Sequence, residues 1–266
     1  MNNVNKTLYI PLYGKAYVSK KNIILHDPKA EEIWEAEGVP LKGKAKSKWL
    51  AYYMGMRSAV FDQWVNEQLA QNPNAVVLHL GCGMDSRVLR VNQENHAWYD
   101  IDFPEVIQER KRYYQETDGY HMLSADVRAD GWITQIPRCQ TAIVVMEGIS
   151  MYMQPEELCQ LLQTIQTHFA SVSLLMDCYT VFAAKATKYK NPINEVGVTK
   201  VYGIDDPLEL TNQTGFTFVK QHEMTPNHLI DALTGLERTL FRNLYAGKTA
   251  EKLYRMYEYQ TALPIN

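Results

Sequence analysis

The segment Val77-Leu78-His79-Leu80-Gly81-Cys82-Gly83 decides the fold of this 266-residue chain. Its first residues continue a short apolar run from Ala75, which is typical of a buried parallel strand. Gly81 and Gly83 follow at once, so the strand ends in a tight turn whose backbone can take a positive φ and approach a ligand closely. Doubly wound sheets bind their ligands outside the carboxyl ends of the strands. The segment therefore predicts a strand, a glycine turn and a ligand site.

The sequence after this segment extends the same pattern. Further buried strands are predicted at residues 97–102, 120–124, 141–146 and 172–176, with helices between them that begin near Asp85, Pro104 and Pro155. Strands that alternate with helices predict a doubly wound, mostly parallel α/β sheet of the Rossmann type. Two more strands, at 216–221 and 253–259, flank a predicted helix at 227–245. We expect this last pair to be antiparallel at the sheet edge, which makes seven strands.

Residues 1–74 have a different character and read as mostly helical. Asp27 is a good N-cap and Pro28 a good first helical residue, so a helix is expected to start there. Apolar residues recur at helical spacing from Trp49 to Leu69. We interpret 1–74 as a helical cap over the ligand. Residues 75–266 form the core, with insertions on the substrate side after about residue 180.

Composition limits the class of protein. The net charge is −3, which gives no electrostatic reason to expect a nucleic acid or an anionic membrane as partner. No apolar stretch is long enough to span a bilayer, and the polar N-terminus does not resemble a signal peptide, so a cytoplasmic protein is expected. The four cysteines show neither a CxxC pair nor metal-ligand spacing. They are expected to be free thiols, and no metal site is predicted.

An acid after the glycine turn indicates the type of ligand. Asp102 ends the second predicted strand, where a carboxylate can accept hydrogen bonds from two ribose hydroxyls of NAD or of S-adenosylmethionine. The NAD fingerprint requires a third glycine where this chain has Ser86, and Asp85 places a negative charge where a pyrophosphate would bind. S-adenosylmethionine carries no phosphate and is favoured, while an NAD-dependent oxidoreductase is disfavoured. The alternative without a ligand is a plain glycine turn, with Asp102 capping the helix at Pro104.

Five blocks in a fixed order make the reading more specific. They are Gly55-Met56-Arg57, Leu80-Gly81-Cys82-Gly83-Met84-Asp85-Ser86-Arg87, Asp100-Ile101-Asp102-Phe103-Pro104-Glu105-Val106, Asp126-Val127-Arg128 and Glu147-Gly148-Ile149-Ser150-Met151-Tyr152-Met153. In order and spacing the chain resembles the leucine carboxyl methyltransferase family, which includes tetracenomycin-type polyketide O-methyltransferases. The resemblance covers about residues 14–165 and weakens after about residue 180, where the substrate pocket is expected.

The resemblance implies a role for individual residues. The predicted cofactor ligands are Arg57 and Lys15 for the methionine carboxylate, Gly81 and Gly83 under the methionine portion, Asp102 for the ribose, Asp126 with Val127 for the adenine, and Glu147 beside the sulfonium. Asp100 competes with Asp102 for the ribose, because both side chains can face the same side of the strand. On the acceptor side Tyr152 is the predicted substrate-binding residue, with His222 and His228 as weaker candidates. No catalytic base is assigned.

The implied activity is transfer of a methyl group from S-adenosylmethionine to a carboxyl or hydroxyl oxygen of a small molecule, either a polyketide-like compound or another metabolite. Two alternatives stay open. In the first, the methyl acceptor is the C-terminal carboxylate of a protein. In the second, the chain binds the cofactor as a non-catalytic partner subunit. Because Lys15 and Arg57 lie outside the predicted core, residues 15–64 are expected to close over the cofactor as a lid.

Overall fold

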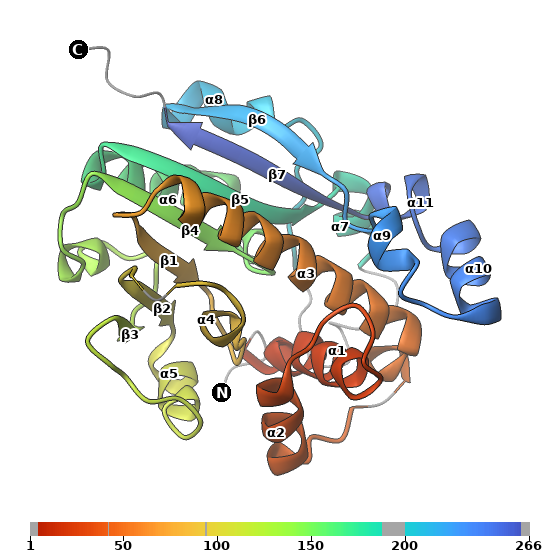
Figure 1. Ribbon diagram of the computed structural model, residues 1–266. Helices are drawn as coiled ribbons and strands as arrows, with labels where there is room; N and C mark the ends of the chain where they lie inside the picture. Colours follow the sequence, from red (N-terminus) through yellow and green to blue (C-terminus); the bar gives the residue numbers. More distant parts are fainter. Residues whose placement is uncertain (1–4, 42, 94, 188–199, 262–266) are drawn as a thin grey trace.

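Seven strands form one sheet in the described part of the chain, which comprises residues 5–41, 43–93, 95–187 and 200–261 of the computed structural model (Figure 1). The strands are β1 (Val76–Leu80), β2 (Trp98–Asp102), β3 (Tyr120–Ser124), β4 (Thr141–Met146), β5 (Ser171–Tyr179), β6 (Phe216–His222) and β7 (Tyr254–Thr261). Their order across the sheet is β3-β2-β1-β4-β5-β7-β6. β1 to β5 run parallel, and β7 is antiparallel to both of its neighbours. The predicted fold class and the antiparallel edge are confirmed.

The order of the strands creates the ligand crevice. From β1 the chain adds β2 and β3 on one side and then crosses to place β4 on the other side. The crossover helices therefore diverge at the boundary between β1 and β4, which is where doubly wound sheets bind ligands. The register aligns His79 with Asp100 on one side and with Val145 on the other. The carboxyl ends of β1, β2 and β4 consequently lie level along one edge.

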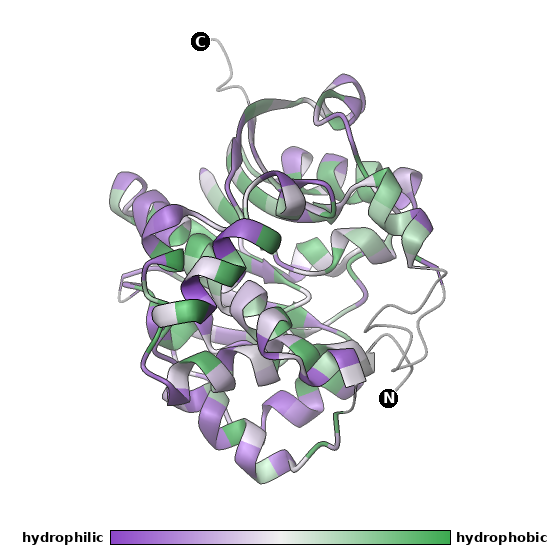
Figure 2. Cartoon of the chain, turned by 90° about the vertical axis from the view of Figure 1, so that its right-hand side faces the viewer, coloured by the Kyte–Doolittle hydropathy of each residue, from purple (hydrophilic) through white to green (hydrophobic). Residues whose placement is uncertain are grey.

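Helices cover both faces of the sheet. They are α1 (Tyr9–Lys20), α2 (Pro28–Glu37), α3 (Lys48–Gln71), α4 (Arg87–Arg90), α5 (Pro104–Arg110), α6 (Pro155–His168), α7 (Val181–Ala186), α8 (Leu208–Thr214), α9 (Asn227–Ile230), α10 (Gly235–Leu244) and α11 (Lys248–Glu251). Single 3₁₀ turns are η1 (Asn5–Leu8), η2 (Gly43–Lys46), η3 (Trp132–Gln135) and η4 (Ser150–Tyr152). Purple and green residues alternate along the peripheral helices in Figure 2, as expected for helices that bury one face.

Two apolar clusters form the core, one on each face of the sheet. Alternate strand residues supply them: Val77 packs in one cluster, and Val76 and Leu78 pack in the other. The first cluster contains apolar residues of α1, α2 and α3, and the second contains the buried stripe of α6. Strand residues that are buried on both faces explain the continuous apolar runs in the sequence. The N-terminal helices thus share a core with the sheet.

A cluster of buried charges also joins the N-terminal helices to the sheet. Arg90 of α4 contacts Asp27 before α2 at 2.7 Å, Asp62 of α3 at 2.7 Å and Asp85 after β1 at 2.9 Å. Arg90 is buried, so each contact is shielded from water and poorly screened. Removing one member of such a cluster leaves its partners as uncompensated buried charges. These contacts hold α2 and α3 against the segment that follows the glycine turn.

Several local predictions can be scored against the structure. The helix at Pro28 is confirmed, and the Asp27 carboxylate accepts a hydrogen bond from the Ala30 amide at 2.9 Å. The long helix expected at 49–69 is α3. The predicted single helix at 227–245 is wrong, because residues 231–234 separate α9 from α10. The helices predicted at residues 85–91 and 105–115 are shorter in the structure, where α4 covers Arg87–Arg90 and α5 covers Pro104–Arg110.

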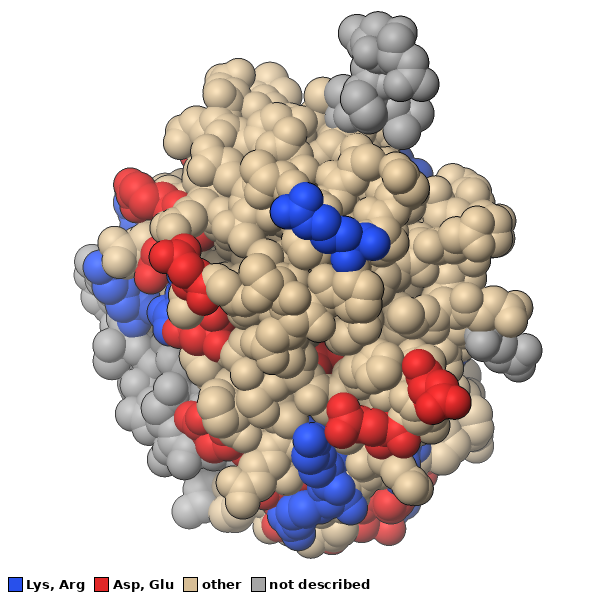
Figure 3. All heavy atoms as spheres, turned by 90° about the vertical axis from the view of Figure 1, so that its left-hand side faces the viewer, with Lys and Arg blue, Asp and Glu red and all other residues tan. Residues whose placement is uncertain are grey.

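The remaining global expectations concern thiols, metals, membranes and surface charge. All four cysteines are free. Within the described residues we find no cluster of potential metal ligands and no helix long and apolar enough to cross a membrane. On the face in Figure 3, acidic and basic side chains are interspersed among uncharged ones, and neither sign forms a continuous patch.

Candidate functional site

A cavity of about 540 Å³ opens at the carboxyl ends of the parallel strands. Residues from α1, α3, the glycine turn and the loops after β2, β3, β4 and β5 line it. The eight predicted cofactor ligands and Tyr152 are all among them: Lys15, Arg57, Gly81, Gly83, Asp102, Asp126, Val127, Glu147 and Tyr152. The structure therefore brings together positions that lie up to 137 residues apart, from Lys15 to Tyr152.

The glycine turn needs glycine for two different reasons. Gly81 has φ +64° and Gly83 has φ +51°, both in the left-handed region that side chains disfavour. A Cβ on Gly81 would also overlap the Cγ2 methyl of Ile149, whereas a Cβ on Gly83 would meet only the Leu8 Cβ at 3.4 Å. Gly81 is thus fixed by a close approach of two loops, and Gly83 by backbone conformation alone.

Asp102 and Asp100 have separate roles in the structure. Asp102 lines the cavity and accepts hydrogen bonds from the amides of Gly83 at 2.8 Å and Phe103 at 2.7 Å. Burial raises the pKa of Asp102 to about 6, although these two hydrogen bonds oppose the rise. Asp100 is fully buried, does not line the cavity, and accepts from Arg110 and from Tyr120 at 2.7 Å. Asp102 is therefore the acid that faces the cavity, and it makes no side-chain cap on α5.

The pair expected at the adenine lies at the rim of the cavity. Asp126 and Val127 follow β3, and both line the cavity. The Asp126 carboxylate accepts from the Arg128 guanidinium at 2.9 and 2.7 Å and from the Arg128 amide at 3.0 Å. Arg128 holds the pKa of Asp126 below its usual range, against a smaller effect of burial. The carboxylate is thus charged and oriented, with Val127 as its apolar neighbour.

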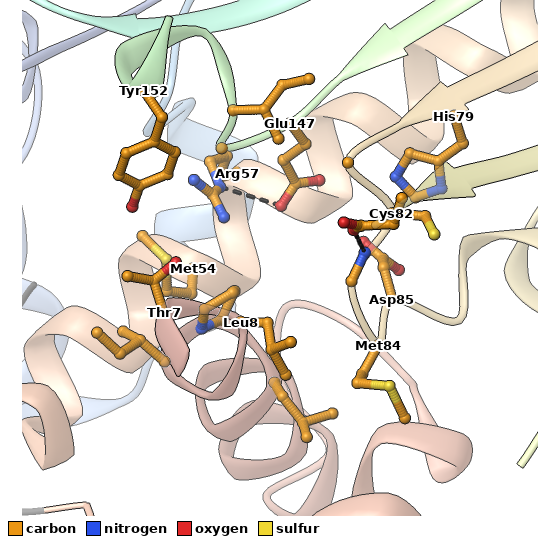
Figure 4. Close-up of a pocket in the computed structure, with 18 of the residues that line it drawn as sticks. Thr7, Leu8, Met54, Arg57, His79, Cys82, Met84, Asp85, Glu147 and Tyr152 are labelled. Carbon is orange, nitrogen blue, oxygen red and sulfur yellow. Dashed lines mark hydrogen bonds and ion pairs between the residues drawn. The ribbon is translucent and has the colours of Figure 1, made fainter. Parts of the chain in front are cut away.

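Arg57 is held between two buried carboxylates. Its Nε lies 3.0 Å from Glu147 Oε1, and its Nη1 lies 3.0 Å from Asp177 Oδ2 and 3.3 Å from the Tyr254 hydroxyl. Arg57 extends from α3 into the cavity beside Glu147 in the close-up of Figure 4. Burial alone would raise the pKa of Glu147, but Arg57 and Arg87 outweigh burial and lower it to about 2. Both predicted residues are therefore charged partners of one another.

Lys15 is paired with protein in this structure. Its ammonium lies 2.9 Å from Asp85 Oδ2, and both side chains are buried at the cavity wall. Asp85 also accepts from the Arg87 amide at 2.9 Å and from Arg90 at 2.9 Å. The sequence argument that Asp85 would repel a pyrophosphate is therefore weakened, because these cations neutralise its charge. The argument against NAD from the missing third glycine is unchanged, because that position is Ser86. Ser86 is fully buried and donates a hydrogen bond to Asp27 at 2.5 Å.

A continuous chain of buried polar contacts runs beneath the cavity, across the ends of four strands. In order its members are Arg110, Asp100, His79, Arg87, Glu147, Arg57 and Asp177. His79 occupies the middle: its Nδ1 lies 3.1 Å from Asp100, and its Nε2 lies 3.2 Å from Arg87 Nη1. Burial lowers the pKa of His79, so the ring is neutral at pH 7 and bridges an anion and a cation.

The opposite end of the cavity has a different composition. Figure 4 shows Tyr152, Met54 and Thr7 on one side of the Arg57–Glu147 pair, and Cys82, Met84 and Asp85 on the other. Other uncharged residues that line the cavity include Leu50, Tyr53, Met153, Met224, Leu253 and Tyr254. His222 and His228 do not line the cavity, and His222 instead lies 2.6 Å from Glu258. Those two weaker candidates are thus not supported as acceptor residues.

The sequence analysis missed Tyr254 and Asp177, although both contact Arg57. Tyr254 is the first residue of β7, and Asp177 lies near the end of β5. An aspartate in an otherwise apolar strand was the available signal for Asp177, since a buried acid needs a partner. Tyr254 gave no comparable signal among the 17 tyrosines of the chain.

The residues present fit S-adenosylmethionine. The glycine turn exposes backbone at the cavity wall, Asp102 retains unused lone pairs on a carboxylate that two amides already orient, and Arg57 presents a fixed cation. Ribose hydroxyls are donors that match Asp102, and a carboxylate matches Arg57. An adenosyl group needs an apolar and acidic rim, which Val127 and Asp126 provide.

Comparisons with known proteins agree with this geometry. The profile of a family described as leucine carboxyl methyltransferase matches residues 11–166. Tetracenomycin polyketide synthesis O-methyltransferase TcmP of Streptomyces glaucescens is 30% identical over 227 residues, with 84% of each chain covered. S-adenosyl-L-methionine-dependent methyltransferase dpfgK of Gibberella zeae is 25% identical, with 79% of this chain and 78% of that protein covered. The solved structure of Synechocystis magnesium protoporphyrin IX methyltransferase with bound SAH is 12% identical, has a TM-score of 0.53, and covers 87% of this chain and 93% of its own, which supports the fold.

Proposed function

We propose that this chain, which belongs to the leucine carboxyl methyltransferase family, methylates a carboxylate oxygen of a small and largely apolar molecule. As a member of that family it is a methyltransferase that depends on S-adenosylmethionine. The observation that carries the finer proposal is the state of the ionisable groups around the cavity. Apart from Asp102, whose free lone pairs we assign to the cofactor ribose, each ionisable group that lines the cavity in the described residues is either engaged by another group or held in its protonated form.

The cofactor ligands of the proposal are the residues that line the inner wall. Arg57 would bind the methionine carboxylate, Asp102 the ribose hydroxyls, and Asp126 with Val127 the adenine. Gly81 and Gly83 would allow the backbone to lie against the methionine portion, and Glu147 would face the cationic groups. Lys15 would support this end through Asp85, to which it is paired, and we propose the N-terminal helices as the cap that closes the site.

When bound, S-adenosylmethionine supplies a methyl group on a sulfonium that needs no further activation. The protein then has to orient the acceptor oxygen, exclude water and leave the oxygen ionised. Alignment of two reactants can lower a barrier by about 7–11 kcal/mol. Apolar residues such as Met54, Leu50 and Met153 line the cavity and would exclude water, and the hydroxyls of Tyr152 and Tyr254 line it as well.

The lining favours an acceptor that is already ionised. A hydroxyl acceptor would require a general base within hydrogen-bond reach. Among the described lining residues, Glu147 and Asp85 are ion-paired, and both ring nitrogens of His79 are engaged. Burial raises the pKa of Tyr152 and of Tyr254, so both phenols stay protonated near pH 7. A carboxylate needs no base, because its ordinary pKa lies near 4.

The same lining favours a small apolar acceptor over a protein terminus. The acceptor end is built from methionine, leucine, tyrosine and alanine side chains. Such a surface gains free energy by covering apolar area, at roughly 25 cal/mol per Å². The relative TcmP is named for polyketide synthesis, and polyketides offer both apolar rings and acid groups. A non-catalytic subunit would gain nothing from this shaped acceptor end.

The test is a labelling experiment with S-adenosylmethionine that carries a tritiated methyl group. Aromatic carboxylic acids, the matching phenols and a peptide with a free carboxyl terminus serve as acceptors, and Asp102→Ala is the control without cofactor binding. Mild alkali releases methyl esters as volatile methanol and leaves methyl ethers intact. We expect alkali-labile label on the acids. Label only in ethers or only on the peptide would contradict the proposed acceptor, and cofactor binding without label on any acceptor would favour the non-catalytic alternative.

A further inference from the structure

Asp177 lies directly behind Arg57 and touches no part of the cavity surface. We propose that Asp177 is a positioning residue. It fixes the position of Arg57 relative to the turn at residues 148–150, and so fixes where the cofactor carboxylate binds relative to the acceptor. The inference rests on the proposed assignment of Arg57 to the cofactor carboxylate. It adds a residue from β5 to a site whose predicted ligands come from other elements.

Three contacts from one residue support this role. Asp177 Oδ2 lies 3.0 Å from Arg57 Nη1, and Asp177 Oδ1 accepts a hydrogen bond from the Gly148 amide at 2.6 Å. The Asp177 backbone carbonyl accepts a further hydrogen bond from the Ser150 hydroxyl. The side chain of Asp177 is 0% exposed, so water does not compete for these contacts. One aspartate therefore joins α3 to the loop after β4 at three points.

The turn and Arg57 are packed too closely to move independently. Gly148 has φ +78°, and a Cβ on it would lie 3.3 Å from Arg57 Nη1. The next residue, Ile149, is the one that fills the space above Gly81. Tyr152, the proposed acceptor-side residue, follows within the same short segment. A shift of Asp177 would consequently move Arg57, the glycine turn at Gly81 and the segment that carries Tyr152.

The groups that face Asp177 are of both signs. Arg57 from α3 carries the opposite charge, Glu147 after β4 carries the same charge, and the phenol of Tyr254 on β7 lies nearby in its neutral, protonated form. Its neighbours also include Tyr152 and Cys178, and burial raises the pKa of Asp177 to about 6 despite Arg57. At pH 7.5 the carboxylate is therefore charged, and it holds the guanidinium by a charge-assisted hydrogen bond.

Direct repulsion between Asp177 and the ligand does not dominate this site. The amino-acid end of the cofactor carries a carboxylate and an ammonium on the same α-carbon, so Asp177 would repel one of these groups and attract the other. Loss of the Asp177 charge would instead leave Glu147 as the only charged partner of Arg57, so the guanidinium could shift toward Glu147. Placement of Arg57 is therefore the property that a substitution at position 177 changes most.

The experiment compares two ligands that differ only in this end. S-adenosylhomocysteine has the amino-acid group, and 5′-methylthioadenosine lacks it. Calorimetry at pH 7.5 on wild type and Asp177→Asn should show S-adenosylhomocysteine binding roughly 10-fold to 100-fold weaker in the variant, as expected for loss of a charged hydrogen bond. The affinity for 5′-methylthioadenosine should change less than about 3-fold on the same grounds.

Asp100→Asn is the matched control, because Asp100 is also a buried strand aspartate paired with an arginine, Arg110, which donates to the Gly83 carbonyl. It should weaken both ligands equally. In an Arg57→Gln background, Asp177→Asn should have no further effect on the preference between the ligands. Equal weakening of both ligands by Asp177→Asn, or no weakening, overturns the inference.

Two further outcomes separate this inference from the function on which it rests. A wild-type protein that binds neither ligand refutes cofactor binding itself, and one that binds both equally refutes the assignment of Arg57; either result removes the premise. If Asp177→Asn does not fold, the wild type provides the test, because protonation of Asp177 below about pH 6 should erode the preference for S-adenosylhomocysteine. A preference that stays constant from pH 7.5 to pH 5 overturns the inference.

Discussion

Replacement of Asp102 by asparagine is the most direct test of the cofactor site. Both carboxylate oxygens already accept an amide hydrogen, from Gly83 at 2.8 Å and from Phe103 at 2.7 Å. Asparagine keeps the shape but turns one oxygen into an NH₂ group, which must face one of these donors. The variant therefore loses one acceptor for a ribose hydroxyl outright and keeps only a neutral acceptor for the other.

The size of the effect follows from these contacts. A hydrogen bond to a charged group contributes about 1.5–3 kcal/mol, and a neutral one about 0.5–1.5 kcal/mol. Loss of one charged bond and weakening of the other amounts to about 3 kcal/mol, or roughly a 100-fold rise in Kd. The orphaned amide also strains the glycine turn, so we expect a lower free energy of unfolding as well.

Calorimetry with S-adenosylhomocysteine measures this change, and denaturant unfolding confirms that the variant is folded. Asp126→Asn is the comparison, because that carboxylate is about one-third exposed and is engaged by Arg128. We expect a change of roughly 5-fold or less there, as for a solvent-exposed polar contact. A Kd for Asp102→Asn within 5-fold of wild type, or a larger effect at position 126, would refute the assignment of the ribose to Asp102.

Three other predictions follow from the same geometry. The affinity for 5′-methylthioadenosine, which keeps the ribose but lacks the amino-acid group, should be constant above pH 7 and fall as the pH drops through about 6, because the ionised Asp102 is the binding form and its pKa is about 6; an affinity that calorimetry finds unchanged between pH 5 and pH 8 would contradict this. Gly81→Ala should lower the free energy of unfolding by about 2–5 kcal/mol, since backbone strain and overlap with Ile149 add, while Gly83→Ala should lower it by about 1–2 kcal/mol from strain alone; equal losses in urea titrations would contradict the overlap. Arg90→Met should cost about 3–5 kcal/mol by leaving three buried aspartates without their shared cation, and a neutral result in the same titration would show that the cluster relaxes.

The sequence predicted the sheet well because strands buried on both faces carry an unambiguous signal. The runs at 120–124 and 141–146 match β3 and β4 to the residue. Helices after about residue 180 were predicted poorly, because short helices such as α9 and α11 have too few turns to display periodicity. The break between α9 and α10 had no proline to mark it. Tertiary packing, rather than local propensity, sets these ends.

The sequence predicted which residues line the cavity, but it did not predict which charged side chains pair with one another. All nine predicted positions line the cavity, because the family blocks and the strand ends locate them. The partners of each charge are a different matter. No local pattern in the sequence indicates that Lys15 pairs with Asp85, or that Asp100 is taken by Arg110 and so leaves Asp102 to the ligand. Such choices depend on side-chain directions that only the folded chain determines.

The two ends of the cavity arise from different parts of the chain, and this has a consequence for how such a protein diversifies. In the chain of buried polar contacts from Arg110 to Asp177, every member has at least one partner. A single replacement there therefore disturbs several other members. The acceptor end is lined by methionine, leucine and alanine from segments such as α7 and the loop before α9, which this chain of contacts does not include. Substitutions at those positions can accumulate one at a time. New acceptors are therefore open to evolution, and to enzyme engineers, while the methyl donor stays the same.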